Sequence, residues 1–162
     1  MPKLYRLSPV IDGLYIGGGS VVFYADDLRQ LGLTRVLKLY VSHPASPPWP
    51  DDFTISENPV KDGMPIPPAA LARGVAFIRD GLAAGEKVLV VCSLGVSRSP
   101  AFMMAYLLEQ SYDLPEAWRL LKTRYPPAAP RPAMWQSLLT HYRLPYTMDD
   151  VAGWLDGAGE GA

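Results

Sequence analysis

The chain has 162 residues, 49% of them hydrophobic, and its formal net charge at pH 7 is −1. This length suits one domain with a sizeable core, and the composition is typical of a soluble globular protein. A nearly neutral chain lacks the strong positive field with which proteins bind nucleic acids or anionic membranes, so we expect neither as a partner.

The cysteine and histidine content limits the kinds of site that are possible. The chain has a single cysteine, Cys92, which excludes an intramolecular disulfide. No CxxC spacing exists, and His43 and His141 lie far apart in sequence, so we expect no metal site. The first residues lack the apolar core of a signal peptide, and no apolar run is long enough to span a bilayer. We therefore expect a cytoplasmic protein, in which a free thiol persists.

The first half of the chain predicts strands that alternate with helices. The segment GLYIGGG (13–19) predicts a short strand that ends in a glycine turn. Its glycines lack the GxGxxG spacing and the lysine of a nucleotide-binding loop. Ser20 is placed to cap a helix that runs to Leu31. The segments 34–41 and 53–60 contain β-branched and aromatic residues that predict two further strands.

The second half of the chain predicts one buried strand and several helices. A helix over 68–84 begins at consecutive prolines and ends before Gly85. The apolar run 87–91 suits a strand that is covered on both faces of a sheet. Further helices are expected over 99–110, 114–125 and 132–143.

The alternation of strands and helices indicates an α/β fold with a central, mostly parallel sheet flanked by helices. Residues 1–146 contain all of these elements and form the expected domain. Residues 147–162 form a C-terminal tail of small and polar residues, in which Trp154 and Leu155 are the only anchors. We expect this tail to fray.

The loop between the buried strand and the next helix, CSLGVSRS, has the features of an anion-binding site. Its backbone amides precede a helix, where unpaired N–H groups form a nest for anions. Gly95 permits a backbone approach that a side chain would block, and the planar fork of Arg98 matches two phosphoryl oxygens. The expected phosphate-binding loop comprises Cys92, Ser93, Leu94, Gly95, Val96, Ser97 and Arg98.

Cys92 is the candidate nucleophile of this loop. A positive field that binds an anion also favours the thiolate form of a cysteine, and a thiolate beneath a bound phosphoryl group is in line with the phosphorus. Ser99 can offer its hydroxyl to the thiolate when the sulfur becomes the leaving group. The competing interpretation is a buried structural cysteine at the end of a core strand. That interpretation does not explain the spacing to Arg98 or the glycine between them.

These residues resemble a known family. The segment CSLGVSRSP resembles the C-x5-R-S signature of the cysteine-dependent protein phosphatases, in their dual-specificity branch. The segments LSPVIDGLYIGG and DDLRQLGLTRVLKLY resemble the opening strand, first helix and second strand of that branch. The segments AFMMAYLL and RPAMWQSLLTHY resemble its helix after the loop and its final helix, so the resemblance covers roughly residues 8–145. It implies a protein tyrosine phosphatase-like fold whose catalytic domain is residues 1–146.

The resemblance also implies an activity and a general acid. The implied reaction is the hydrolysis of phosphotyrosine, phosphoserine or phosphothreonine through a phosphocysteine intermediate, with no metal or cofactor. Asp62 lies thirty residues before Cys92, in the turn of NPVKDGMPI, where the family carries the aspartate that protonates the leaving oxygen. Asp-Gly is also a common turn dipeptide. Glu57 is the alternative acid.

One position departs from the family pattern. The resemblance implies a histidine immediately before the cysteine, where this chain has Val91. Valine cannot form the hydrogen bond by which that histidine would hold the loop. Two functions therefore remain open: a working phosphatase that loses activity at lower pH, or a weakly active or inactive phosphate-binding pseudophosphatase module. The presence of Cys92, Arg98, Ser99 and Asp62 favours the working enzyme. A rhodanese-like sulfurtransferase fits the pair Arg98–Ser99 poorly.

The loop also indicates the class of substrate. It carries no lysine, which favours a single phosphate on a protein or a small phosphate monoester over an inositide with several phosphates. Lys61, Arg131 or Arg124 could add charge through folding. We expect phosphate, sulfate and vanadate to be ligands of the site. The proline-rich segment 43–50, which contains Trp49, either lines the mouth of the site or is a rigid surface connector.

Overall fold

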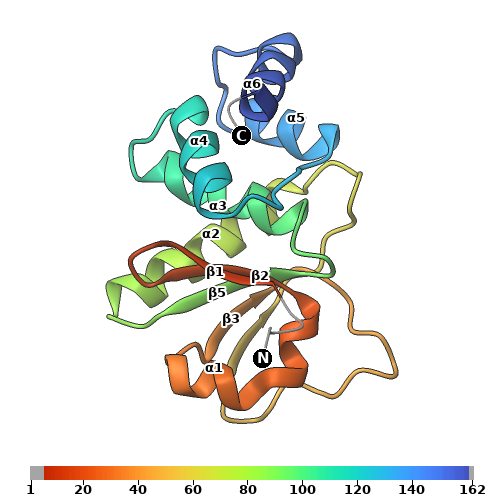
Figure 1. The fold of residues 1–162 in the computed structure, drawn as a ribbon, viewed down its shortest axis with the longest axis vertical. Coiled ribbons are helices and arrows are strands. Elements are labelled where there is room, and N and C mark those ends of the chain that lie inside the picture. Colours follow the sequence, from red (N-terminus) through yellow and green to blue (C-terminus); the bar gives the residue numbers. More distant parts are fainter. Residues whose placement is uncertain (1–5, 161–162) are drawn as a thin grey trace.

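The computed structural model describes residues 6–160, which form a five-stranded sheet with helices on both faces (Figure 1). The strands are β1 (Leu7–Ile11), β2 (Leu14–Gly18), β3 (Arg35–Lys38), β4 (Thr54–Glu57) and β5 (Val88–Cys92). Their order in the sheet is β1-β2-β5-β3-β4. Strand β1 pairs with β2 in antiparallel fashion, and the other three pairings are parallel. The predicted α/β fold with a mostly parallel sheet is therefore confirmed.

The helices divide unequally between the two faces of the sheet. They are the 3-10 helix η1 (Gly19–Tyr24) and the α-helices α1 (Ala25–Leu31), α2 (Pro68–Ala83), α3 (Arg98–Glu109), α4 (Leu114–Arg124), α5 (Pro132–His141) and α6 (Met148–Glu160). Helix α1 covers one face, and α2 to α6 lie on the other (Figure 1). Apolar side chains form one core cluster on each face.

The burial of β5 explains its continuous apolar sequence. All five of its residues are buried. Successive strand side chains point to opposite faces, so Val90 and Cys92 enter the core beneath α2 and α3, whereas Leu89 and Val91 enter the core beneath α1. The run 87–91 was correctly predicted to be covered on both faces.

Two predicted elements near the N-terminus differ from the structure. Ser20 does not cap a helix: η1 begins at Gly19 with Gly18 as its N-cap residue and no side-chain cap, and Ser20 lies inside it. The strand expected over 34–41 ends at Lys38. Backbone hydrogen bonds continue as far as Leu39, whose amide donates to the Val91 carbonyl (2.9 Å) and whose carbonyl accepts from the Val60 amide (3.1 Å) and from the Arg98 guanidinium (3.3 Å). The Leu39 carbonyl thus connects the end of this strand to Arg98.

The ends of the chain also differ from expectation. Strand β1 contains Pro9, a residue that weakens the sequence signal for a strand, and its pairing with β2 is irregular between Pro9 and Ile11. The C-terminal tail is not frayed over 148–160, because these residues form helix α6. Val151 on α6 is 1% exposed, and the Trp154 ring lies 5.0 Å from the Tyr146 ring. This packing supplies the apolar contacts that the small, polar sequence did not suggest.

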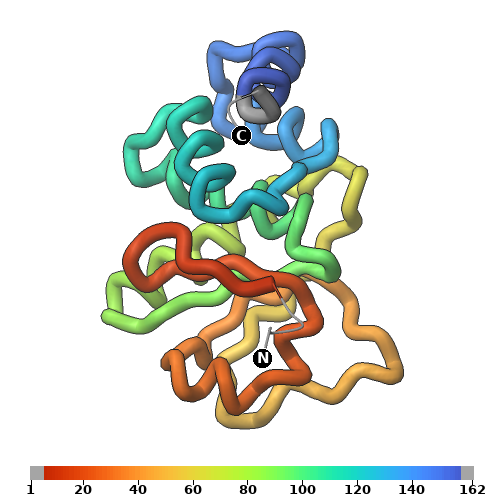
Figure 2. The backbone as a smooth tube through the Cα atoms, viewed as in Figure 1, coloured from red at the N-terminus to blue at the C-terminus, as the bar shows by residue number. Residues whose placement is uncertain are grey.

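The loops that follow the parallel strands gather at one edge of the sheet. Because β2, β5, β3 and β4 run parallel, their carboxyl ends lie at the same edge. Figure 2 shows the loop 93–97 on the same side of the molecule as the segments 41–50 and 61–66. Ligand sites of parallel sheets occur at this edge. Among the helices of residues 6–160, none is long and apolar enough to cross a membrane.

Candidate active site

The loop between β5 and α3 turns its carbonyl groups outward. The Ser93 carbonyl accepts a hydrogen bond from the Gly19 amide (3.0 Å), the Leu94 carbonyl from the Arg6 guanidinium (2.8 Å), and the Val96 carbonyl from the Ala129 amide (2.6 Å). In a trans peptide the C=O and the following N–H point in opposite directions, and the described chain has no cis bond. The amides that follow these carbonyls therefore point into the loop. This arrangement forms the predicted nest for an anion.

Cys92 and Ser99 meet at the base of this nest. Cys92 ends β5, and its side chain is buried, with 2% exposure. The Ser99 amide, in the first turn of α3, donates a hydrogen bond to the Cys92 sulfur at 3.4 Å. The Ser99 hydroxyl is buried and has no hydrogen-bond partner among the described residues. An amide and a hydroxyl at the start of a helix are suited to stabilise negative charge on the sulfur.

The Arg98 guanidinium is fixed from one side. Its Nη1 donates to the carbonyls of Val60 (3.0 Å) and Leu39 (3.3 Å), in the segments that follow β4 and β3. Its buried Nε has no partner among the described residues. A buried, unpaired donor is costly, so a guanidinium held in this way is prepared for an oxyanion.

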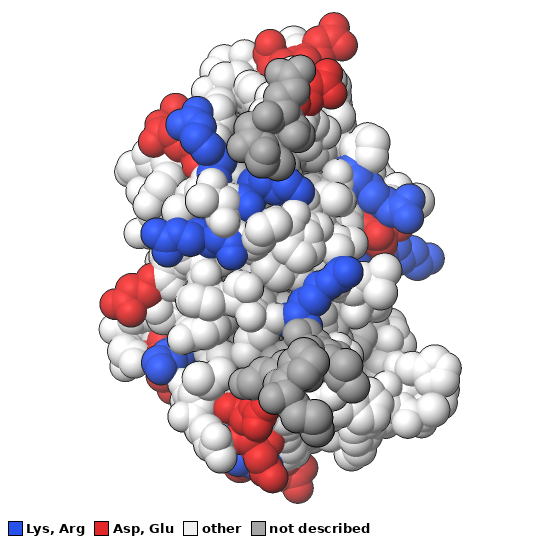
Figure 3. Space-filling view, viewed as in Figure 1, with Lys and Arg blue, Asp and Glu red and all other residues white. Residues whose placement is uncertain are grey.

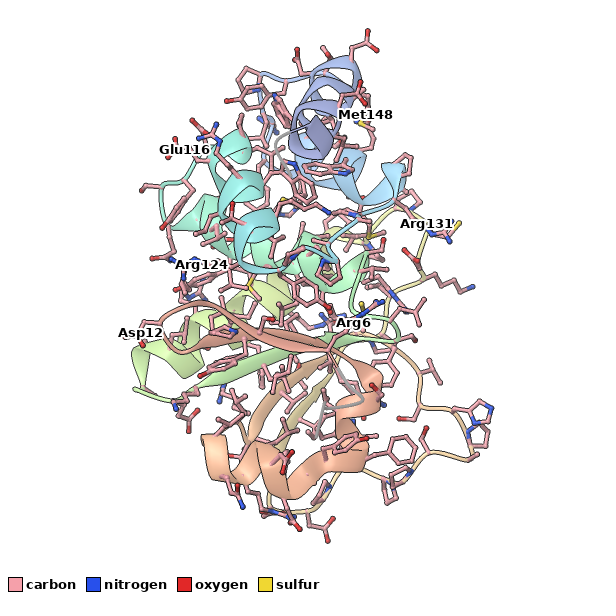
Figure 4. All side chains as sticks on the ribbon, in the orientation of Figure 1. Arg6, Asp12, Glu116, Arg124, Arg131 and Met148 are labelled. Carbon is pink, nitrogen blue, oxygen red and sulfur yellow. The ribbon has the colours of Figure 1, made fainter. Side chains whose placement is uncertain are left out.

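Ser97 connects the candidate acid to the loop. Its hydroxyl, almost fully buried, donates to Oδ1 of Asp62 (2.6 Å) and accepts from the Arg131 amide (3.0 Å). The Arg131 guanidinium completes the set through a 3.0 Å bond from Nε to Oδ2 of Asp62. Arg131 is labelled in Figure 4 on the side to which the loop projects. The structure thus holds Asp62 at the rim of the loop, with both carboxylate oxygens accepting hydrogen bonds.

A glycine run supports the loop from behind. Gly95 has a φ of +73°, and a β-carbon at this position would lie 2.7 Å from the Tyr125 hydroxyl and 2.9 Å from the backbone of Gly17. A β-carbon at Gly18 would lie 3.2 Å from the backbone of Leu94. The segment IGGGS is therefore the surface against which the loop packs, which requires close backbone contact. Burial raises the pKa of Tyr125 to about 12.

Val91 lies on the other face of the sheet from Cys92. Its side chain is fully buried in the apolar cluster that includes Val36, Leu89 and Tyr40. Its carbonyl accepts a hydrogen bond from the Leu39 amide at 2.9 Å. The loop is consequently held by backbone bonds and by Arg6, not by a side chain at position 91.

Other charged residues named from the sequence lie away from the loop or on its margin. Glu57 is on the edge strand β4, where its carboxylate pairs with the buried Lys38 (3.0 Å). Arg124, at the end of α4, and Arg131 lie on opposite sides of the view in Figure 4. Lys61 is exposed beside Asp62. Trp49 donates to the Tyr40 hydroxyl and packs on Phe53, which fastens the segment 43–50 to the core beneath α1.

Sequence reasoning missed the partners that orient the predicted residues. The sequence marks Arg131 only as a possible source of charge and indicates no role for Arg6, Tyr125 or Ala129. Their contacts join positions separated by as many as 88 residues, as for Arg6 and Leu94, so no local pattern reveals them. The prolines of the segment 126–132, before α5, are the one local signal that the backbone next to Arg131 is conformationally restricted.

The fold and this loop agree with comparisons to known proteins. The family described as dual specificity phosphatase, catalytic domain, matches residues 14–144. The chain belongs to this family. It is therefore a member of the protein-tyrosine and dual-specificity phosphatases, which are hydrolases of phosphate esters on proteins.

Individual relatives support the assignment. Dual specificity protein phosphatase 1B of Arabidopsis thaliana is 31% identical over 128 residues, which cover 78% of this chain and 75% of that protein. Human dual specificity protein phosphatase 12 is 36% identical over 107 residues, 64% of this chain and only 32% of that protein. A crystal structure of a mouse putative dual specificity phosphatase, complexed with zinc tungstate, superposes with a TM-score of 0.76. That match covers 87% of this chain and 90% of the mouse chain at 23% identity, and it supports the fold.

Proposed function

We propose that this protein hydrolyses phosphate monoesters of protein tyrosine, serine or threonine through a phosphocysteine intermediate. The observation that carries the proposal is the loop itself: inward amides, a buried sulfur at the base and a guanidinium with an unpaired Nε. The catalytic unit is residues 1–146, and α6 supports it by packing on α4 and α5. The reaction uses no metal, because each charge that develops has a partner from the chain.

In the first step, the Cys92 thiolate attacks phosphorus and the bond from phosphorus to the ester oxygen breaks. The loop amides and Arg98 hold the equatorial oxygens and stabilise the charge that spreads over them. Asp62, protonated in the complex with substrate, gives its proton to the departing oxygen. The products of this step are the alcohol, the Asp62 carboxylate and a phosphocysteine.

In the second step, water hydrolyses the phosphocysteine. The Asp62 carboxylate accepts a proton from water, whose oxygen attacks phosphorus while the bond from phosphorus to sulfur breaks. The sulfur departs as a thiolate, to which the Ser99 amide and hydroxyl can donate. Inorganic phosphate leaves, and the proton that Asp62 accepted from water restores the acid for the next cycle.

Turnover of a small aryl phosphate tests this proposal. We expect the purified protein to release p-nitrophenol from p-nitrophenyl phosphate in the presence of EDTA. Cys92→Ser should abolish turnover, because the hydroxyl is a far weaker nucleophile. Asp62→Asn should reduce turnover by about 10²-fold or more, because it removes the general acid.

The second candidate function is phosphate binding without turnover, which the apolar environment of Val91 favours. In that case the wild-type protein would release no p-nitrophenol but would still bind vanadate or phosphate, as detected by calorimetry. Turnover that persists in Cys92→Ser would contradict the phosphocysteine route itself.

A further inference from the structure

Four exposed apolar side chains lie in the segments that follow the parallel strands. Phe23, Val41, Met64 and Leu94 are 62%, 80%, 54% and 69% exposed, and we call these four residues the apolar rim. One other large hydrophobic residue of the described chain, Leu155 on α6, is also exposed, at 38%. Single exposed apolar residues need no explanation, but a group of them at one site indicates a binding surface.

The topology of the sheet brings the apolar rim together. Phe23 lies in η1 after β2, Val41 follows β3, Met64 lies in the turn after β4, and Leu94 is in the loop after β5. Neighbouring strands are about 4.8 Å apart, so the carboxyl ends of these four strands extend over about 15 Å. An extended peptide of roughly five residues covers the same length.

Contacts between these segments fix them around Cys92. The Gly19 amide, in η1, donates to the Ser93 carbonyl of the loop, and the backbone of Gly18 touches that of Leu94. Tyr40, directly before Val41, packs against Gly19. Met64 is two residues from Asp62, which bonds to Ser97. A protein segment that delivers a phosphate to Cys92 therefore lies among the segments that carry the apolar rim.

Charge around the rim favours a protein segment over a lipid surface. A membrane-binding surface would surround its apolar residues with lysine and arginine. The segment 41–50 has no charged residue, and the lower right of Figure 3, where this segment projects, is uncharged. The nearby guanidinium groups of Arg6 and Arg131 already bond to Leu94 and Asp62.

We propose that the apolar rim selects phosphoprotein segments with apolar side chains within two positions of the phosphorylated residue. This inference rests on the proposed function, because the phosphorylated residue is the one that enters the loop. Apolar flanks would bury surface against Phe23, Val41 and Leu94, whereas acidic flanks would lose water there without gaining a cation. Lys61 and Arg131 are exposed cations beside Asp62, and a preference of these two cations for acidic flanks is the competing expectation.

Matched phosphopeptides test the selection. Two phosphotyrosine peptides of equal length are compared. The apolar peptide has leucine and valine at the two positions on each side of the phosphotyrosine, and the acidic peptide has glutamate at the same positions. We expect kcat/KM for the apolar peptide to exceed that for the acidic peptide by about tenfold or more. Phe23→Ser or Val41→Ser should lower kcat/KM for the apolar peptide about fivefold and leave p-nitrophenyl phosphate turnover unchanged. Leu155→Ser, the matched control on α6, should change neither.

Binding to the Cys92→Ser variant gives a second reading that does not depend on turnover. If wild type fails to hydrolyse p-nitrophenyl phosphate, the proposed activity is wrong, and the peptide preference is then decided by affinity for Cys92→Ser. Equal values for the two peptides, or equal effects of Leu155→Ser and Phe23→Ser, would overturn the inference. A lipid substrate would also overturn it. In that case the protein would release phosphate from vesicles that contain a phosphatidylinositol monophosphate, Phe23→Ser would lower this release, and the two peptides would be hydrolysed equally well.

Discussion

At the scale of single residues, the position of the Asp62 carboxylate depends on Arg131. One carboxylate oxygen accepts from Ser97, which is buried in the loop, and the other accepts from Arg131, whose side chain is 66% exposed. An exposed ion pair contributes little to stability. Its geometry can still matter, because a general acid must be placed accurately against the leaving oxygen. Arg131 is therefore a positioning residue rather than a stabilising one.

Arg131→Met should impair only those reactions that need the acid. We expect turnover of phenyl phosphate to fall about tenfold, because its leaving oxygen requires a proton, and turnover of dinitrophenyl phosphate to change by less than about twofold. The measurement is kcat for both esters. Lys61→Met is the matched control, since it removes a neighbouring positive charge and leaves both hydrogen bonds of Asp62. Equal losses on both esters would show a general structural effect instead.

The sequence indicates the proposed reacting groups more directly than the residues that hold them. Cys92, Gly95, Arg98 and Ser99 follow one another within a single loop, so their spacing is a local property that the sequence displays. The bonds from Arg131 to Asp62 and from Arg6 to Leu94 exist only after folding. The role of Ser97 as a link between Asp62 and Arg131 follows from the same long-range contacts and had no local signal.

At the scale of elements, the end of β2 and the loop between β5 and α3 are packed against each other. Gly18 and Gly95 allow the two backbones to approach closely, because a β-carbon at Gly18 would lie 3.2 Å from Leu94 and one at Gly95 would lie 2.9 Å from Gly17. The Gly19 amide also bonds to the Ser93 carbonyl. The sequence predicts no nucleotide-binding role for the glycines at the end of β2, since they lack the GxGxxG spacing. It could not show that they face a loop more than seventy residues away, because that contact results from the parallel pairing of β2 with β5.

Gly95→Ala should disrupt this contact. The new methyl group would meet both Gly17 and the Tyr125 hydroxyl, and the residue would keep an unfavourable positive φ. We expect a loss of about 1 to 3 kcal/mol in the free energy of unfolding and at least about tenfold in turnover. Denaturant titration and p-nitrophenyl phosphate turnover measure the two effects.

Gly85→Ala is the control for the backbone effect. Gly85 has a φ of +79° but no atom within 4 Å of the position of a β-carbon, and it lies at the end of α2. Gly85→Ala should lower the free energy of unfolding through the same backbone strain at positive φ and should retain full turnover. If Gly95→Ala also retained full turnover, the contact between β2 and the loop would not be required for catalysis.

The predicted elements differ in accuracy for physical reasons. Helices α2 to α5 and strand β5 have long apolar patterns and clear proline or glycine boundaries, and the predictions match them closely. Strand β3 ends at Lys38, and the apolar residues Leu39 and Tyr40, which extended the predicted strand, are buried in the core beyond its end. Helix α6 was missed because its stability comes from the packing of Val151 and Trp154 on the preceding helices, not from its own composition.

At the scale of the whole molecule, buried tyrosines set an alkaline limit to stability. Burial raises the pKa of Tyr125 from 10.0 to about 12. Burial and the carboxylate of Glu109 raise the pKa of Tyr142 as well, and burial raises that of Tyr40. A folded-state pKa above the unfolded value means that stability is fully present below pH 10 and is lost as the pH rises towards the folded pKa. Proton linkage therefore predicts that the free energy of unfolding falls between about pH 10 and 12.

Tyr125→Phe isolates one contribution to this limit. The Tyr125 hydroxyl is buried without a hydrogen-bond partner among the described residues, so phenylalanine should leave the free energy of unfolding nearly unchanged at pH 8. At pH 11 the wild type should have lost about 1 kcal/mol through Tyr125, and the variant should be more stable by that amount. Tyr142→Phe should behave differently, because it loses a 2.8 Å hydrogen bond to Glu109 and so costs about 1 kcal/mol already at pH 8. Denaturant titrations of the three proteins at pH 8 and pH 11 measure these free energies of unfolding. If the difference in free energy between wild type and Tyr125→Phe is the same at both pH values, Tyr125 does not limit alkaline stability.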